Sequence, residues 1–310
     1  MFIEAAQRTN VWAADLEDGC GDFMNSVKTV LLLGLLSGIL LVGGEALGGS
    51  RGLQYGLILA IGMNFFSYFF SDKLALMSYS AQSVTPEESP EIYGRLAPIV
   101  QRLTQKMGLP MPKLWVIPED SPNAFATGRD PQHASVAVTE GILRLMSDRE
   151  LEGVLAHEMG HVLHRDILIS SVAATIASAI TFLSRMAFFF GGSRDREDRG
   201  SAWGGLLMMI LAPIAALLIQ MAISRTREFD ADAASVKYTG SPDPLIHALR
   251  KLESGVQRVP MYDASPSTAH LFILNPFRGG LFRMFSTHPS TEERIARLEQ
   301  MRNPALVSVN

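Results

Sequence analysis

Long uncharged stretches interrupt the mixed pattern of apolar and polar residues in this chain. A helix that crosses a bilayer needs about 20 predominantly apolar residues. Four stretches approach or exceed this length, at residues 29–44, 52–71, 167–184 and 201–224. The first two are joined by a short Gly-rich turn, and Tyr55 and Tyr68 lie near the ends of the second stretch, as interfacial aromatic residues often do. The pattern predicts about four transmembrane helices, grouped as hairpins at 27–72 and 167–224.

Each apolar stretch has an alternative interpretation as a buried core helix. The second pair is richer in Ala and Ser, so a hairpin only partly embedded in the membrane is a further alternative for 167–224. The first stretch also resembles the core of a signal peptide. Secretory signals are basic before that core, whereas residues 1–26 are acidic, with Arg8 as their one basic residue. We therefore expect residues 1–26 to form an acidic, flexible tail.

The segments 73–166 and 225–310, outside the hairpins, have the patterns of soluble α and β structure. Apolar residues at helical spacing predict helices at 86–107, 226–238, 244–253 and 291–301. Short runs rich in β-branched and aromatic residues predict strands at 113–117, 123–127 and 135–139. Residues 255–288 have an irregular pattern with several Pro. The predicted fold class is α+β, mostly helical with a small β-sheet.

Composition excludes several classes of protein. The 310 residues carry a net charge of -4, so no basic surface points to nucleic acid as a partner. Cys20 is the only cysteine, which excludes an intrachain disulfide and a thiolate metal cluster. Hydrophobic residues make up 47% of the chain, a high share for a soluble enzyme, and this agrees with the predicted spans.

The segment His157–His161 reads H-E-x-x-H. On a helix, residues four apart share a face, so both imidazoles can bind one metal ion. Zinc binds neutral imidazole readily and activates a water molecule near neutral pH, and Glu158 lies close enough to act on that water. The implied chemistry is attack of water on a carbonyl group, as in peptide hydrolysis.

The alternative is a chance match, which arises in roughly one such chain in a hundred. The local sequence favours the metal site, because the motif lies inside a strong helix pattern. Ser147 is a suitable N-cap with Glu150 three residues later, the spacing of a capping box. Apolar residues then recur at helical spacing, at Leu151, Val154, Leu155 and Val162.

A catalytic zinc usually has three protein ligands and one open position. His164 shares a face with His157 but lies a turn beyond His161. The metzincin pattern would need Gly at position 164 and His at 167, and neither is present. Glu228 and Asp232 are four apart, so Glu228 could bind zinc while Asp232 accepts a hydrogen bond from a ligand histidine. An ordinary solvated charge cluster is the alternative for these two acids.

Four motifs in order give the chain a resemblance to a known family. They are 122–128 (PNAFATG), 157–161 (HEMGH), 224–232 (SRTREFDAD) and 285–290 (FSTHPS) followed by Glu293-Arg294-Ile295. Over roughly residues 27–301 the sequence resembles the HtpX family of membrane-integrated zinc metallopeptidases, relatives of the CaaX-processing Ste24 type. The resemblance implies that Glu228 is the third zinc ligand. It also implies four membrane-associated helices, a zinc domain facing the cytosol, and cleavage of damaged or misfolded membrane proteins under stress.

Two further roles are implied by the same match. His288 would donate a hydrogen bond to the oxyanion of the tetrahedral intermediate, with a simple turn residue before Pro289 as the alternative. Asn123, Ala124, Phe125 and Ala126 would form an edge strand that pairs with the substrate backbone, with an ordinary hairpin strand as the alternative. The acidic segment 1–26 departs from the usual start of the family, where the first span begins almost at once.

Charge near the span ends predicts the topology. His157 and Glu228 are separated by two predicted spans, so they lie on one side of the membrane. That side carries more basic residues near the spans, namely Lys28, Lys73, Arg149, Arg165, Arg225, Arg227 and Lys237. The opposite side has Arg51, Arg194, Arg196 and Arg199, and Arg185 is a further candidate there. Because positive charge favours the cytoplasmic side, the catalytic domain is expected in the cytoplasm, at a bacterial inner membrane.

The sequence thus predicts a gluzincin-like zinc endopeptidase with one Zn²⁺ per subunit on His157, His161 and Glu228. Glu158 would act as general base and later protonate the leaving amine. The expected partners are unfolded or membrane-embedded protein substrates, the lipid bilayer and other membrane quality-control proteases. A CaaX-type prenyl-protein protease is an alternative enzyme, although that type has more spans. A catalytically silent membrane scaffold is the alternative outside enzymes, and the intact Glu158 argues against it.

Overall fold

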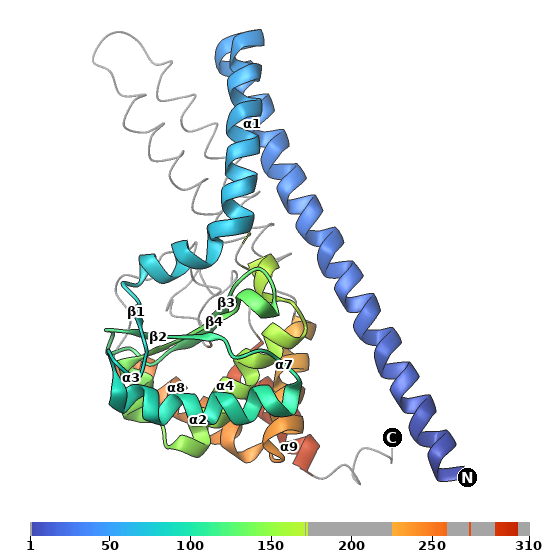
Figure 1. Ribbon diagram of the computed structural model, residues 1–310, viewed down its shortest axis with the longest axis vertical. Helices are drawn as coiled ribbons and strands as arrows, with labels where there is room; N and C mark the ends of the chain where they lie inside the picture. Colours follow the sequence, from blue (N-terminus) through green and yellow to red (C-terminus); the bar gives the residue numbers. More distant parts are fainter. Residues whose placement is uncertain (1, 171, 173–224, 259–272, 274–288, 303–310) are drawn as a thin grey trace.

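The computed structural model describes residues 2–170, 172, 225–258, 273 and 289–302 (Figure 1). Most of the predicted second hairpin, 167–224, lies outside the described residues, and so do most of the segment 255–288 and His288 itself. Within the described part the protein is mostly helical with one small mixed sheet, in agreement with the predicted α+β class.

Helix α1 (Phe2–Ser78) folds back on itself at Gly49, whose φ of 57° and ψ of -140° break the helical geometry. Gly44 and Gly52 face each other across the bend, and a side chain on either would collide with the backbone of the other arm. Further along, Asn64 donates a hydrogen bond to Ser37 at 2.8 Å. The two arms therefore lie side by side as a helical hairpin, which projects from the rest of the protein (Figure 1).

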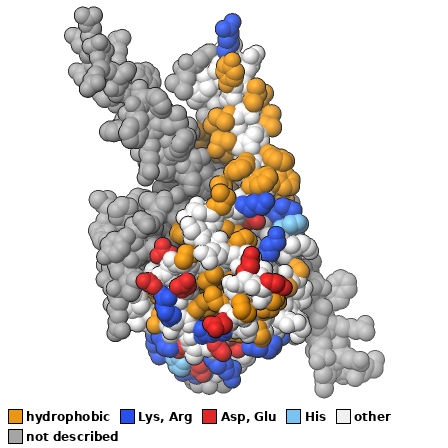
Figure 2. Space-filling model, turned by 60° about the vertical axis from the view of Figure 1, so that its left-hand side comes forward, with side chains coloured by type: hydrophobic (Ala, Val, Ile, Leu, Met, Phe, Trp, Pro, Cys, Tyr) orange, Lys and Arg blue, Asp and Glu red, His pale blue; other side chains and the backbone are white. Residues whose placement is uncertain are grey.

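Both arms of α1 are long and apolar enough to cross a membrane, over Val27–Glu45 and Gly49–Phe70. Of the roughly four predicted spans, these two fall within the described residues. Large hydrophobic side chains on the arms are exposed, among them Val30, Tyr55, Ile58, Ile61 and Phe65. Figure 2 shows hydrophobic side chains over the projecting part of α1 and charged side chains over the domain below it. A large exposed apolar surface indicates contact with a membrane or a partner.

The segment 2–26 differs from the expected flexible tail, because in the structure it is the first part of α1. Its composition gives the reason. Up to Leu16 the segment has four Ala together with single Glu, Gln, Arg and Leu residues, all of high helix propensity. The excess of acidic residues in this segment does not prevent a helix from forming.

The sheet has the strand order β1-β2-β4-β3. Its strands are β1 (Gln82–Ser83), β2 (Lys113–Ile117), β3 (Ala124–Thr127) and β4 (Ser135–Thr139). Strand β2 runs parallel to β4, whereas β1 and β3 are antiparallel to their neighbours. The predicted strands 113–117, 123–127 and 135–139 correspond to β2, β3 and β4, and the two-residue β1 was not predicted. In this order β3 is an edge strand of the described sheet.

The described helices after α1 are α2 (Pro90–Met107), α3 (Glu140–Leu145), α4 (Asp148–Leu163), α7 (Arg225–Thr239), α8 (Asp243–Arg258) and α9 (Thr291–Arg302). A short 3₁₀ turn, η1 (Pro131–His133), lies between β3 and β4. Helix α2 begins four residues later than predicted, because Ser89 is the N-cap and Pro90 occupies the first turn. Helix α8 extends past its predicted end, and the short α3 was not predicted.

Helix α4 lies at the centre of the domain and packs against α2, α7, α8 and strand β3. It begins with the predicted capping box: Ser147 accepts a hydrogen bond from the Glu150 N–H, and Glu150 accepts one from the Ser147 N–H at 2.8 Å. Two glycines allow its neighbours to approach. Gly160 lies against Ala231 of α7, and Gly153 lies against the start of α8 at Pro244 and Leu245.

Gly153 provides a test of this packing. A Cβ atom at this position would lie 2.7 Å from the Leu245 backbone nitrogen, so the Gly153→Ala variant must displace backbone. We expect a loss of about 1–3 kcal/mol of unfolding free energy from overpacking. Gly94→Ala in α2 is the matched control, because its Cβ meets nothing within 4 Å. The control should gain about 0.5–1 kcal/mol from helix propensity. The melting temperature of the detergent-purified protein tests both variants. Equal shifts in melting temperature for Gly153→Ala and Gly94→Ala would contradict the packing argument.

Candidate metal centre

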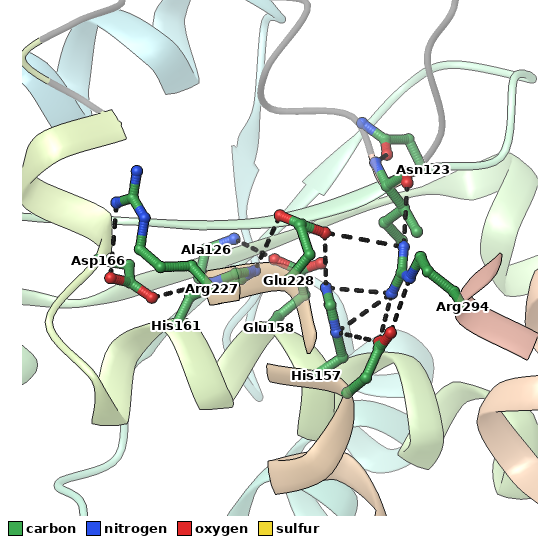
Figure 3. Close-up of polar contacts among 11 residues, drawn as sticks. Asn123, Ala126, His157, Glu158, His161, Asp166, Arg227, Glu228 and Arg294 are labelled. Carbon is green, nitrogen blue, oxygen red and sulfur yellow. Dashed lines mark hydrogen bonds and ion pairs between the residues drawn. The ribbon is translucent and has the colours of Figure 1, made fainter. Parts of the chain in front are cut away.

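Three side chains on two helices converge in the structure (Figure 3). His157 and His161 come from successive turns of α4, and Glu228 comes from the first turn of α7. One ligand atom of each lies within 4.8 Å of the others. The His157 Nε2 atom is 3.7 Å from Glu228 Oε2, and the His161 Nε2 atom is 3.7 Å from Glu228 Oε1. The two imidazole rings are nearly perpendicular, with centroids 4.9 Å apart.

This donor set fits zinc. Ligand atoms that surround a tetrahedral zinc ion at about 2.0–2.1 Å are about 3.3 Å from one another, close to the two 3.7 Å separations found here. Two neutral imidazoles and one carboxylate are also a donor combination typical of catalytic zinc. Glu228 is 5% exposed and His157 is 2% exposed, so both donors lie out of bulk water.

Asp232 holds the ring of His157 from the side opposite Glu228. The Nδ1 atom of His157 lies 2.9 Å from Asp232 Oδ1. Because a carboxylate oxygen can only accept, Nδ1 carries the proton and the lone pair is on Nε2, the atom nearest Glu228. Burial alone would raise the pKa of Asp232, but the Arg294 guanidinium and the His157 ring outweigh it and hold that pKa below its ordinary value.

Arg294 of α9 is 0% exposed and binds Asp232 through two nitrogens. The distances are 2.6 Å from Nη2 to Oδ1 and 2.9 Å from Nε to Oδ2. Its Nη1 atom also donates to the Ile273 carbonyl at 3.4 Å and lies 3.8 Å from Glu228 Oε2. This guanidinium thus connects α9 to both Glu228, a candidate metal ligand, and the carboxylate that contacts His157 Nδ1 (Figure 3).

His161 has a carboxylate partner of its own. Its Nδ1 atom lies 3.4 Å from Asp166 Oδ2, and Asp166 Oδ1 accepts from Arg227 Nη1 at 3.5 Å. Burial of the ring would lower its pKa, but the hydrogen bond to Asp166 and the charge of Glu228 raise the pKa of His161 to about 9. A metal ligand must be deprotonated, so a metal ion and a proton compete for this ring.

Glu158 lies between the metal-facing side chains and the edge strand β3. Its Oε2 atom accepts a hydrogen bond from the Ala126 N–H at 3.0 Å. Burial is the largest influence and raises the pKa of the Glu158 carboxyl above its ordinary value, and the charge of Glu228 acts in the same direction. A carboxylate whose proton affinity is increased is a better proton acceptor, as general-base catalysis requires.

The predicted substrate strand corresponds to β3 and the residue before it. Ala124, Phe125 and Ala126 lie in β3, paired with Val138, Ala137 and Val136 of β4. The Asn123 carbonyl accepts from the Thr139 N–H at 2.9 Å, and the Asn123 side chain accepts from the Ile273 N–H at 3.1 Å. The Ala126 amide points the other way, across the edge that β4 does not cover, towards α4.

The structure brings together His157, Glu158, His161, Glu228, Asp232 and the strand at 124–126. His164 is the C-cap of α4 and is not part of the converging group. His288 lies outside the described residues. No sequence expectation placed Asp166, Arg227 or Arg294 in the site, and Arg227 was named only for its charge near a predicted span. The only sequence signal for Arg294 was its place in the motif after His288. The only signal for Asp166 was its position as an acidic residue five residues after His161.

Sequence comparisons with known proteins agree on one family. The profile of peptidase family M48 matches residues 91–302. The protease HtpX homolog of Desulfatibacillum aliphaticivorans is 54% identical over 281 residues, which cover 88% of this chain and 89% of that protein. The protease HtpX homolog of Methylibium petroleiphilum is 50% identical over 280 residues, which cover 89% of this chain and 98% of that protein. Among solved structures, S. mikatae Ste24p matches 91% of this chain at 17% identity with a TM-score of 0.46, and the match spans 66% of that protein's length.

Arg294 provides a test of the buried charges. Arg294→Met keeps a shorter unbranched side chain but leaves Asp232 without its positive partner, and breaking a buried pair costs about 3–5 kcal/mol. Arg250→Met is the control, because Arg250 forms a surface pair with Glu299 at 3.0 Å that also joins α9 to the domain. Surface pairs contribute at most about 1 kcal/mol. Thermal unfolding should therefore separate the two variants, and similar melting temperatures would show that the Asp232 pair contributes little.

Proposed function

We propose a function for this chain from one premise, that it belongs to peptidase family M48 and is therefore a metallopeptidase. Our proposal is that it is a membrane-anchored zinc endopeptidase that cleaves misfolded or damaged membrane proteins. The observation that carries the proposal is the convergence of His157, His161 and Glu228 beside Glu158, next to the edge of β3 that no described strand pairs with. Ligands, base and substrate strand then lie within one site.

In this proposal His157, His161 and Glu228 hold one zinc ion. When bound, zinc supplies a Lewis acid that polarises water and the scissile carbonyl group. The charges support a divalent cation. Among the described side chains, the carboxylates of Glu158, Asp166, Glu228 and Asp232 outnumber the arginines paired with them, Arg227 and Arg294, once the imidazoles are neutral, as metal ligands must be. Buried charge of one sign is costly unless it is balanced.

Glu158 takes a proton from the attacking water and later transfers it to the leaving amine. Its position supports this role, because the carboxylate is held by the Ala126 N–H while it faces the same space as the two histidines (Figure 3). The raised pKa of Glu158 makes both transfers easier near neutral pH than an ordinary Glu would allow.

Strand β3 aligns the substrate. An extended peptide can add to an unpaired sheet edge, where main-chain hydrogen bonds give affinity without strict sequence choice. The outward Ala126 amide and its proximity to Glu158 support this role, with Asn123, Ala124 and Phe125 fixing the strand in register. We further propose that His288 donates a hydrogen bond to the oxyanion that forms on the substrate carbonyl.

The membrane location rests on the two apolar arms of α1 and on their exposed hydrophobic side chains. We propose about four spans in total, a zinc domain in the cytoplasm and a bacterial inner membrane. The Lys and Arg bias near the span ends supports this orientation. A domain tethered beside the bilayer would meet membrane proteins that have lost their fold, and this suits a role in quality control under stress.

The direct test uses the full chain purified in detergent and unfolded casein as substrate. Cleavage should proceed, stop when a zinc chelator is added, and return when zinc is restored. Cleavage that the chelator leaves unchanged would rule out the metallopeptidase mechanism for this site.

Glu158→Gln isolates the general base. The Gln side chain keeps the size of Glu and can still accept from Ala126, but it cannot take the proton of the attacking water. Casein cleavage should fall by about a hundredfold or more, while zinc content stays at the wild-type level. Glu152→Gln on the same helix is the control and should leave the rate unchanged. A Glu158→Gln variant that retains more than about a tenth of the wild-type rate would argue against this role.

The third ligand is tested by comparing Glu228→Ala with His164→Ala. Glu228 faces both histidines, whereas His164 caps the end of α4. Removal of one of three protein ligands should strip zinc from the purified protein, so metal analysis should find Glu228→Ala largely empty and His164→Ala loaded. The reverse result would show that the coordination sphere includes His164 instead of Glu228.

A further inference from the structure

The two histidines of the metal centre are held in the same way. Each presents its Nε2 atom to Glu228, at 3.7 Å in both cases. Each has a carboxylate at its Nδ1 atom, Asp232 for His157 at 2.9 Å and Asp166 for His161 at 3.4 Å. Each carboxylate also contacts an arginine, Arg294 or Arg227. The arrangement around His161 therefore repeats the one around His157, with residues from other parts of the chain.

Asp166 is well placed to hold His161. It is 3% exposed, so water does not compete strongly for its oxygens. The chain turns at Arg165, which has a φ of 55°, and the Asp166 N–H then donates to the His161 carbonyl at 2.9 Å. A non-glycine residue in this left-handed region carries a conformational cost of about 1 kcal/mol or more. The turn thus brings Asp166 back beside His161, which precedes it by five residues in the sequence.

Arg227 connects this carboxylate to the second helix of the site. Its Nη1 atom lies 3.5 Å from Asp166 Oδ1, and the two residues are 61 positions apart in the sequence. Arg227 directly precedes Glu228 on α7. One carboxylate therefore links the end of α4, which carries His161, to the start of α7, which carries the carboxylate facing it (Figure 3).

We propose that Asp166, supported by Arg227, is a positioning residue for His161, so that the Nε2 lone pair of the ring faces zinc. The proposal rests on the zinc site described under the proposed function. A neutral imidazole has two tautomers, and a carboxylate at Nδ1 selects the one in which Nε2 is the free acceptor. The same contact fixes the rotation of the ring. Loss of such a partner typically weakens metal binding 10–100-fold.

The experiment measures the zinc affinity of the full-length protein in detergent by competition with a chelator. Asp166→Ala removes the acceptor, and Asp166→Asn keeps an oxygen that can accept from Nδ1. Asp230→Ala is the matched control. Asp230 is an exposed carboxylate of α7 whose charge acts on His161 and Asp166 without the Nδ1 contact that Asp166 makes. The control therefore removes a similar charge without removing the hydrogen bond.

We expect Asp166→Ala to bind zinc 10–100-fold more weakly than wild type, Asp230→Ala to stay close to wild type, and Asp166→Asn to recover most of the lost affinity. The absorption spectrum of the cobalt-loaded protein should change in Asp166→Ala and return in Asp166→Asn. A structural ion pair with Arg227 alone would not be restored by Asn, because Asn carries no charge. If Asp166→Asn binds zinc as weakly as Asp166→Ala, the proposal is therefore overturned.

His157→Ala separates this proposal from the zinc site itself. If wild type binds zinc and His157→Ala does not, the site stands, and wild-type affinity in Asp166→Ala then overturns only the role of Asp166. If His157→Ala binds zinc as well as wild type, the proposed site and this inference both fail. Melting curves of the metal-free variants show whether the Asp166→Ala protein is folded. If it is unfolded, the zinc affinity of Asp166→Asn alone tests the proposal.

Discussion

The close contact between α4 and α7 is the constraint on which the site depends. Two possible ligands lie on α4 and the third on α7, so the backbones must approach until a glutamate reaches two imidazoles at once. Gly160 permits this approach, because a Cβ there would lie 3.1 Å from both Ala231 Cα and Ala234 Cβ. Ser235 adds a hydrogen bond to the Gly153 carbonyl at 2.8 Å. Small residues along one line of each helix thus set the distance between the donors.

The close packing of α4 and α7 places several charged side chains away from water. In the structure most of these charges lie next to a charge of opposite sign. Asp232 is joined to Arg294, and Asp166 is joined to Arg227, so each carboxylate behind a histidine has a cationic partner. Breaking one such pair exposes the remaining charge to its full desolvation cost. Glu158 and Glu228 are the carboxylates that face the histidines, and Glu228 also lies 3.8 Å from Arg294 Nη1. A divalent cation held between the proposed ligands would offset part of their negative charge.

The sequence predicted the parts of the protein that depend on near neighbours. The capping box at Ser147 and Glu150 and the spacing of His157 and His161 are local patterns, and the structure has both on α4. Most of the side chains around these histidines come from distant parts of the sequence. Arg294 is 62 positions from Asp232, the carboxylate that it holds beside His157, and helix pattern alone cannot tell an arginine that is buried against an aspartate from one that is solvated. Strand β1 and helix α3 were missed because each is too short to show a period.

The contact between Glu158 and Ala126 couples two roles that are usually treated apart. In the proposed mechanism, a peptide that adds to the edge of β3 seeks the same outward main-chain groups, and one of them, the Ala126 N–H, is bonded to Glu158, the proposed general base. If the base keeps this bond, the substrate backbone is aligned relative to a carboxylate whose position is fixed by the strand itself. If the substrate takes the amide, the carboxylate loses a hydrogen bond that favours its charged form, so its proton affinity rises as the peptide binds. In either case the position of the strand edge and the strength of the base are linked through one amide group.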